Sequence, residues 1–98
     1  MKAIDLRILE ILHNASKEKP HCITISEMAC KTNYDKKYLL RRLDKLMSKG
    51  YVYEDTTPEP YYTNVQRVYK DYDAFKYYYY SYYLSVGGRA LYNAIKSL

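Results

Sequence analysis

Apolar residues recur at helical spacing near the N-terminus of the chain. Over residues 3–15 they fall on one face of a helix, which carries Ile4, Ile8, Ile11, Leu12 and Ala15. Leu6 and Leu9 lie away from that face on the helical wheel. Two interpretations follow: a wide stripe that packs entirely in the core, or a second apolar surface that meets another subunit. Either way, the pattern predicts a first helix over 3–15.

Shorter elements follow a charged loop at residues 16–22. The run Ile-Thr-Ile at 23–25 alternates as a very short strand does. Ser26 is placed to cap a helix over 26–32, because its hydroxyl can accept from free backbone N–H groups. Asn33 tolerates the left-handed conformation that a tight turn needs, and Asn33 or Asp35 can cap the next helix. A helix-turn-helix is therefore expected over 26–49.

The next helix, from Asp35 to Ser48, separates its apolar from its basic residues. Its apolar side carries Leu39, Leu43, Leu46 and Met47. Its opposite side carries Lys37, Tyr38, Arg41 and Lys45. Gly50 is suited to end this helix, and residues 51–55 read as a strand. One face of the helix is thus predicted to pack in the core and the other to meet solvent or a ligand.

The rest of the chain is rich in tyrosine, and 61–85 holds ten of the fifteen tyrosines. Residues 56–60 are expected to form a loop, and strands are predicted at 65–69 and 77–84, because tyrosine favours a pleated surface. Gly87-Gly88 is predicted to break the second strand, so that a last helix starts near Arg89. The apolar stripe of that helix comprises Ala90, Leu91, Ala94, Ile95 and Leu98. The order of elements predicts a single α+β domain over 1–98, with a wing at 51–85 and a C-terminal helix at 89–98.

The net charge of +5 is confined to one stretch of the chain. The run from Lys31 to Lys49 holds seven basic and two acidic residues, while the remaining residues carry nine of each sign. A solvated charged face is the plain alternative, but such faces usually mix both signs. The segregated basic residues therefore favour contact with a polyanion.

Two segments resemble winged-helix regulators such as those of the MarR and PadR families. Residues 23–55, and LDKLMSKGYV within them, are similar to the helix-turn-helix and first wing strand of these families. The segment YYLSVGGRALYNAI is similar to their second wing strand and following helix. The resemblance implies a winged helix-turn-helix. It does not cover residues 56–81, where these families usually have a short wing tip, so the wing of this chain is expected to be extended and tyrosine-rich. The small size and the Tyr- and Lys-rich composition also suggest an archaeal virus or plasmid protein.

The resemblance implies that the 35–48 helix enters the major groove of double-stranded DNA. Residues expected to reach base edges are Lys36, Lys37, Tyr38, Arg41 and Arg42. Arg41 is the best candidate for a bidentate contact with guanine. Phosphate contacts are expected from Lys31, Lys45, Thr24, Ser26, Thr32 and Tyr34. In the wing, the candidates are Arg67, Lys70 and Lys76.

The predicted function is sequence-specific DNA binding by a dimeric transcription regulator. A homodimer is expected because two recognition helices related by a two-fold axis read a palindrome. Its expected surfaces are helix 1, through Leu6 and Leu9, and the C-terminal helix, through Leu91, Ile95 and Leu98. Two alternatives use the same scaffold: a plasmid-partition or DNA-organising protein, and a protein–protein interaction module that uses the tyrosine-rich segment 61–83.

Other classes of protein fit the sequence poorly. No nucleophile elbow, phosphate loop or paired histidine motif indicates an enzyme, and no cofactor is expected. No apolar run approaches the ~20 residues of a membrane span, and the N-terminus does not read as a signal peptide, so a cytoplasmic protein is expected. Cys22 and Cys30 are interpreted as small buried or half-buried thiols, with a disulfide within or between chains as the alternative. Their spacing with His13 and His21 matches no strong zinc pattern, so no metal is expected.

Overall fold

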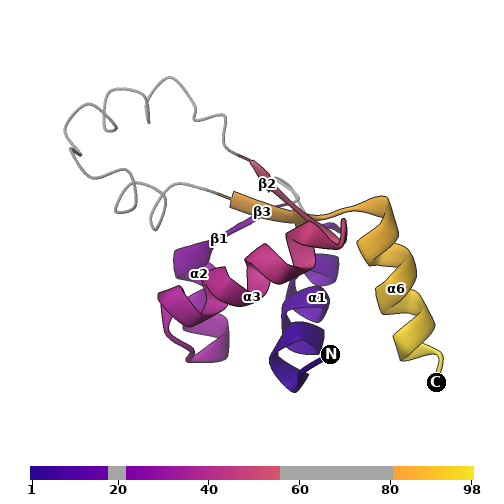
Figure 1. Cartoon of the computed structure of the whole chain (residues 1–98), viewed down its shortest axis with the longest axis horizontal. Coiled ribbons are helices and arrows are strands. Elements are labelled where there is room, and N and C mark those ends of the chain that lie inside the picture. The colour runs from indigo at the N-terminus through magenta and orange to yellow at the C-terminus, as the bar shows by residue number, and fades with distance from the viewer. Residues whose placement is uncertain (18–21, 56–80) are drawn as a thin grey trace.

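The computed structural model describes residues 1–17, 22–55 and 81–98. Its elements in chain order are α1 (Ala3–Ala15), β1 (Ile23–Thr24), α2 (Ile25–Thr32), α3 (Lys36–Ser48), β2 (Val52–Asp55), β3 (Ser81–Leu84) and α6 (Val86–Lys96). Figure 1 shows a small sheet along one edge of the molecule, with the helices beneath it. The predicted α+β winged helix-turn-helix is confirmed. The loop predicted at 56–60, the strand predicted at 65–69 and the first part of the 77–84 strand lie outside the described residues.

Strand β3 lies in the middle of a three-stranded antiparallel sheet with the order β1-β3-β2. Residues alternate between its two faces as the pleat requires. Val52 is opposite Leu84 and both are buried, whereas Tyr53 is opposite Tyr83 and both are exposed. The rings of this exposed pair lie 5.5 Å apart. The sheet thus has one face in the core and one aromatic face in solvent.

Helix α1 supplies much of the core and matches the predicted bounds. Its buried apolar residues are Ile4, Ile8, Leu9, Ile11 and Leu12. Leu9 is 0% exposed, so the prediction that it meets another subunit is wrong, and the wide core stripe is the correct interpretation for this residue. The physical reason is that α1 packs against α2, α3, β3 and α6, which cover more than one narrow face. Leu6 is 37% exposed and remains on the surface.

The start of α2 differs from the prediction. Thr24, not Ser26, is the N-cap: its hydroxyl accepts a hydrogen bond of 3.2 Å from the backbone N–H of Glu27. Thr24 is still extended because it pairs with Ser81 in the sheet, so the helix begins directly after it. β1 therefore ends one residue earlier than predicted, and Ser26 lies in the first turn of α2.

The turn between α2 and α3 and the end of α3 follow the sequence prediction. Asn33 adopts the left-handed conformation with φ 60°. The carboxylate of Asp35 accepts from the backbone N–H of Lys37 at 3.2 Å and caps α3. Gly50, with φ +80°, follows the last turn and leads into β2. Asn33 and Asp35 thus shape the turn from α2 into α3, and Gly50 shapes the turn from α3 into β2.

Helix α6 begins at Val86 and ends at Lys96, three residues earlier at its start than the helix predicted from Arg89. Ser85 caps it by accepting a hydrogen bond of 2.9 Å from the N–H of Gly88, and its hydroxyl donates to the Gly50 carbonyl at 2.5 Å. Gly87 and Gly88 therefore form the first helical turn and do not break the strand. A Cβ on Gly88 would overlap the backbone carbonyl of Tyr51 and would come within 2.8 Å of Leu84 Cδ1. The glycine is needed for close approach.

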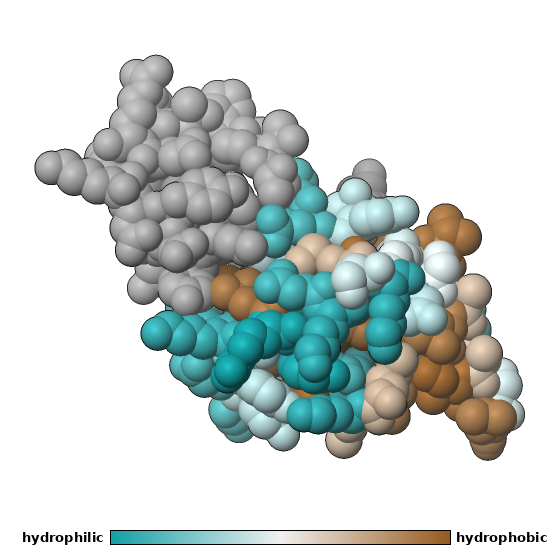
Figure 2. Space-filling model, viewed as in Figure 1, coloured by the Kyte–Doolittle hydropathy of each residue, from teal (hydrophilic) through white to brown (hydrophobic). Residues whose placement is uncertain are grey.

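Helix α6 packs along α1, and the rings of His13 and Tyr92 lie 4.6 Å apart between the two helices. Figure 2 shows apolar side chains over α6 at the edge of the molecule. Among its residues, Leu91 and Ile95 are half-buried, and Leu98 beyond its end is fully exposed. None of the helices in the described ranges is long and apolar enough to cross a membrane.

Candidate nucleic-acid interface

The outer face of α3 carries three of the exposed basic residues of the helix-turn-helix. Lys37, Arg41 and Lys45 are exposed, while Leu39, Leu43 and Leu46 on the other side are buried. Figure 2 shows hydrophilic side chains over the middle of the molecule, where α3 runs in Figure 1. The predicted separation of a leucine face from a basic face is confirmed. We call the exposed residues Lys37, Arg41 and Lys45, with half-buried Tyr38, the α3 outer face.

Two tyrosine rings and an arginine follow one another at the start of this face. The ring of Tyr34, in the turn before α3, lies 5.4 Å from the ring of Tyr38. The guanidinium carbon of Arg41 lies 6.0 Å from the centroid of the Tyr38 ring. Cation–π attraction at this distance restrains an otherwise flexible side chain. Arg41 is thus exposed and partly held in place.

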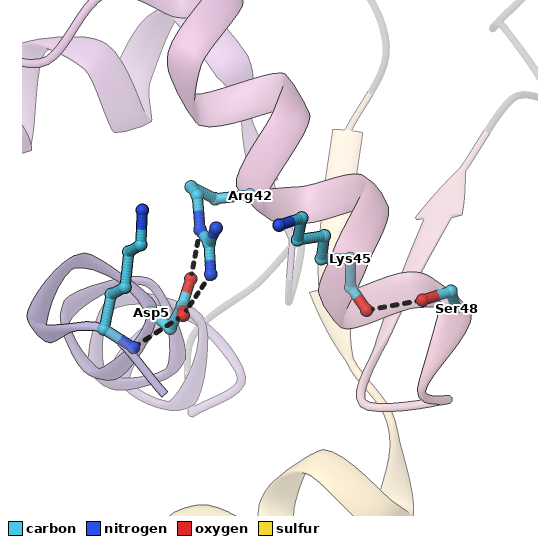
Figure 3. Close-up of polar contacts among 5 residues, drawn as sticks. Asp5, Arg42, Lys45 and Ser48 are labelled. Atoms are coloured by element: carbon cyan, nitrogen blue, oxygen red, sulfur yellow. Dashed lines mark hydrogen bonds and ion pairs between the residues drawn. The ribbon is translucent and has the colours of Figure 1, made fainter.

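Arg42 does not belong to the outer face. It is 9% exposed, and its Nε and one terminal nitrogen donate hydrogen bonds of 2.9 Å and 2.6 Å to the two carboxylate oxygens of Asp5 (Figure 3). Its predicted contact with base edges is therefore corrected: the guanidinium points to α1 and its donors face a buried carboxylate. On α3, Arg42 comes directly after Arg41, and this one-residue step rotates it to the edge of the buried side.

Asp5 and Arg42 stabilise each other's charged forms. The two hydrogen bonds from Arg42 lower the pKa of the Asp5 carboxyl, against the opposing effect of burial, and a hydrogen bond from the Lys2 backbone N–H lowers it further. The same hydrogen bonds to Asp5 raise the pKa of Arg42. Both groups therefore stay charged at neutral pH and neutralise each other.

The hydroxyls proposed for phosphate contact have varied surroundings. The Thr24 hydroxyl donates to a carboxylate oxygen of Glu27 at 3.3 Å, and the Thr32 hydroxyl donates to the Met28 carbonyl at 2.8 Å. Both donors are thus used within α2. Ser26 is half-buried and Tyr34 is exposed. Among the lysines, Lys31 is exposed and Lys36 is half-buried. The wing candidates, Arg67, Lys70 and Lys76, lie outside the described residues.

The sequence analysis did not single out three residues that contact α3 or the segment directly after it. Asp5 holds Arg42, and Ser85 and Gly88 attach the start of α6 to the turn between α3 and β2. Asp5 carried a usable signal, because it interrupts an apolar helix face at a position where a charge needs a partner. Ser85 and Gly88 gave none, because their contacts are with a segment more than thirty residues earlier.

The two cysteines are free thiols, with Cys22 half-buried and Cys30 exposed, so the burial predicted for both applies to Cys22 alone. Within residues 1–17, 22–55 and 81–98, no group of three or more histidine, cysteine or acidic side chains is arranged to hold a metal ion.

A bracing helix, a tight turn, a basic helix and an antiparallel strand pair define a winged helix-turn-helix domain. Residues 1–53 match the family described as winged helix-turn-helix DNA-binding, and the chain belongs to that family. The fold is similar to wild-type apo MarR from E. coli, with a TM-score of 0.70, 24% identity, and coverage of 100% of this chain and 57% of that one.

A mutant of the same MarR protein, with serine in place of a cysteine, matches with a TM-score of 0.67 and 26% identity over 96% of this chain and 54% of that one. The chain thus spans slightly more than half the length of the MarR chains that it matches. No significant match was found among curated proteins.

Proposed function

We propose that the chain binds double-stranded DNA sequence-specifically, as a homodimeric transcription regulator, with α3 in the major groove. The observation that carries this proposal is the α3 outer face: Lys37, Arg41 and Lys45 are exposed together on a helix braced by α2. Basic side chains on such a helix release counterions from phosphates and present donors to base edges. Membership of the winged helix-turn-helix family supports the same geometry.

The roles within the site differ by position. Arg41 is proposed to read guanine, because its fork of donors matches the two acceptors on that base in the major groove. Lys37, Tyr38 and Lys36, near the start of α3, are proposed to reach neighbouring bases. Lys31, Lys45 and the Tyr34 hydroxyl are proposed to hold phosphates and set register, as are the wing residues Arg67, Lys70 and Lys76.

A homodimer is proposed on two grounds. A single recognition helix reads few base pairs, whereas two copies about a two-fold axis read a palindrome. The chain also exposes apolar side chains on the elements expected at the interface: Leu6 on α1 is 37% exposed and Leu98 after α6 is 102% exposed.

Selection of bound sequences from a random pool of DNA duplexes tests the proposal. We expect one palindromic consensus and a footprint of constant length. A footprint that lengthens with protein concentration would instead indicate a DNA-organising protein, and failure to enrich any sequence would contradict sequence-specific binding.

Two charge-matched variants locate the contact surface. Arg41→Ala should weaken binding to the consensus by about 1–3 kcal/mol for each half-site, the value of one bidentate base contact. Arg7→Ala removes the same charge from α1, where Arg7 pairs with Glu10 on the surface, and should leave the affinity nearly unchanged. Equal affinities for both variants would favour a protein-binding role for this domain over DNA recognition.

A further inference from the structure

The ion pair between Asp5 and Arg42 joins α1 to the middle of α3. Asp5 is 2% exposed and Arg42 is 9% exposed, and both carboxylate oxygens are bound by the guanidinium (Figure 3). The carboxylate is itself fixed, because it accepts a further hydrogen bond of 2.9 Å from the Lys2 backbone N–H at the start of α1. The contact therefore ties one end of the first helix to the helix that carries the outer face.

Apolar packing also joins the two helices. Apolar side chains from both helices, among them Ile8 and Leu43, are already fully buried in a common core. Replacing a buried ion pair with apolar side chains of similar volume is often neutral or stabilising. An apolar contact does not fix the orientation of one helix on the other. A bidentate guanidinium–carboxylate pair does, because both of its hydrogen bonds form only in a narrow range of orientations.

Arg42 links the orientation of α3 to the position of the Arg41 side chain. It directly follows Arg41, so a rotation or shift of α3 that lengthens the bonds to Asp5 also displaces the Arg41 side chain. Base contacts depend on alignment, whereas phosphate contacts tolerate small displacements because they rest largely on charge.

We propose that Asp5 and Arg42 are positioning residues for DNA recognition: their ion pair sets the orientation of α3 on α1 and thereby aligns Arg41 with base edges, without touching DNA. The inference rests on the proposed function of the α3 outer face. It predicts that the pair controls the ratio of specific to non-specific affinity, because only specific binding depends on alignment. It also predicts no contribution of Arg42 to the salt dependence of binding, since its charge is already neutralised by Asp5.

The decisive experiment compares the unmodified chain with the double variant Asp5→Leu/Arg42→Met, which replaces both charges with apolar groups. Each protein is titrated with a duplex carrying the sequence selected by the unmodified chain and with a random duplex of the same length, over a series of salt concentrations. We expect a midpoint of thermal unfolding as high as that of the unmodified chain. Affinity for the selected duplex should fall about tenfold for each half-site, the loss expected for one misaligned base contact, while affinity for the random duplex and the salt slope stay the same.

Lys45→Met is the matched control for a charge that faces DNA. Losing one phosphate contact per chain should reduce the salt slope by about 0.9 for each bound chain, or about 1.8 for the proposed dimer, and weaken binding to both duplexes alike. If the double variant does not fold, Arg42→Lys decides the question, because it keeps the charge and removes the bidentate fork. It should show the same selective loss of affinity for the selected duplex.

Two results would overturn the inference: a folded double variant that binds the selected duplex as tightly as the unmodified chain, or a reduced salt slope that shows Arg42 contacting phosphate directly. If the double variant does not fold, unchanged affinity of Arg42→Lys for the selected duplex would also overturn the inference. Failure of the unmodified chain to select any sequence would overturn the proposed function, and the inference would fall with it.

Discussion

At the scale of single residues, Gly88 lies where the backbone of an earlier segment leaves no room for a side chain. Its amide is held by the Ser85 hydroxyl, and an added Cβ would overlap the Tyr51 carbonyl. Gly87, its neighbour in the same helical turn, has no such restriction, because an added Cβ there would make only ordinary contacts of 3.6 and 3.7 Å. Close approach of the backbone thus requires glycine at position 88 but not at position 87.

Gly88→Ala should therefore lower the free energy of unfolding by about 1–3 kcal/mol, the usual cost of forcing extra atoms into a packed site. Gly87→Ala should be neutral or stabilising by up to about 1 kcal/mol, because alanine loses less backbone entropy than glycine in a helix. Urea denaturation of the two variants measures both effects. Similar losses for both would show that helix propensity, not close approach, governs this turn.

Tyr38 supports Arg41 on the α3 outer face. Tyr38→Leu removes the ring that lies 6.0 Å from the guanidinium. An exposed cation–π contact is worth about 0.5–1 kcal/mol, so discrimination between the selected sequence and one with its contacted guanine replaced should fall about two- to fivefold. Tyr38→Phe keeps the ring and should keep the discrimination. A loss that is equal in both variants would assign the effect to the hydroxyl instead.

At the scale of elements, apolar periodicity identified the helices better than it identified their ends. The bounds of α1 follow directly from the spacing of its isoleucines and leucines. The start of α2 was misplaced because Thr24 and Ser26 are both good caps in isolation, and pairing of Thr24 in the sheet decides between them. The start of α6 was misplaced because a glycine pair usually breaks structure, and only the distant Tyr51 carbonyl explains Gly88.

The outer face of α3 is predictable from the sequence, whereas the partner of Arg42 is not. Lys37, Arg41 and Lys45 recur every four residues, so their common face follows from helix geometry alone. The direction in which the Arg42 side chain points depends on its ion pair with Asp5, which lies 37 positions earlier in the chain. Periodicity places a side chain on a helix but does not reveal its partner on another helix.

The contact between α1 and α6 should make stability depend on pH. Burial against Tyr92 lowers the pKa of His13, and the nearby charges of Lys17, Lys96 and Arg89 lower it further. The unfolded chain therefore takes up a proton near pH 6.5, before the folded chain does. Stability should be full above that pH and should decline as the pH falls below it.

Thermal unfolding of the unmodified chain and of His13→Gln between about pH 5 and pH 8 measures this effect. The midpoint of unfolding of His13→Gln should depend on pH much less than that of the unmodified chain. The Asp5 carboxyl stays ionised over this range, because its pKa is lowered from 3.8, so it contributes nothing to the slope. Parallel curves for the two proteins would contradict the assignment to His13.

At the scale of the whole molecule, polar and apolar surfaces are separated in space. Figure 2 shows hydrophilic side chains over α3 and apolar side chains over α6 at another edge. On α6, Ile95 is half-buried, and Leu91 and Tyr92 pack against the buried core cluster. The proposed DNA-binding face on α3 and the apolar side of α6 therefore lie apart, so the proposed dimer can form while DNA is bound.

Ile95→Glu should weaken the proposed homodimer. In an isologous interface each substitution occurs twice, and a charge buried among apolar side chains is costly without a partner. We expect the dissociation constant of the dimer to rise at least about tenfold, or ~1.4 kcal/mol. Asn93→Glu places the same charge on the exposed opposite side of α6 and should leave the dimer intact. Sedimentation velocity over a range of concentrations measures both.

The same variants separate assembly from DNA contact. Ile95→Glu should lose affinity for the palindromic consensus while its affinity for a single half-site stays unchanged, because the α3 outer face of each chain is unaltered. Asn93→Glu should bind both duplexes as the unmodified chain does. If Ile95→Glu remained dimeric, or became monomeric without losing affinity for the palindrome, α6 would not be the surface through which two recognition helices are joined.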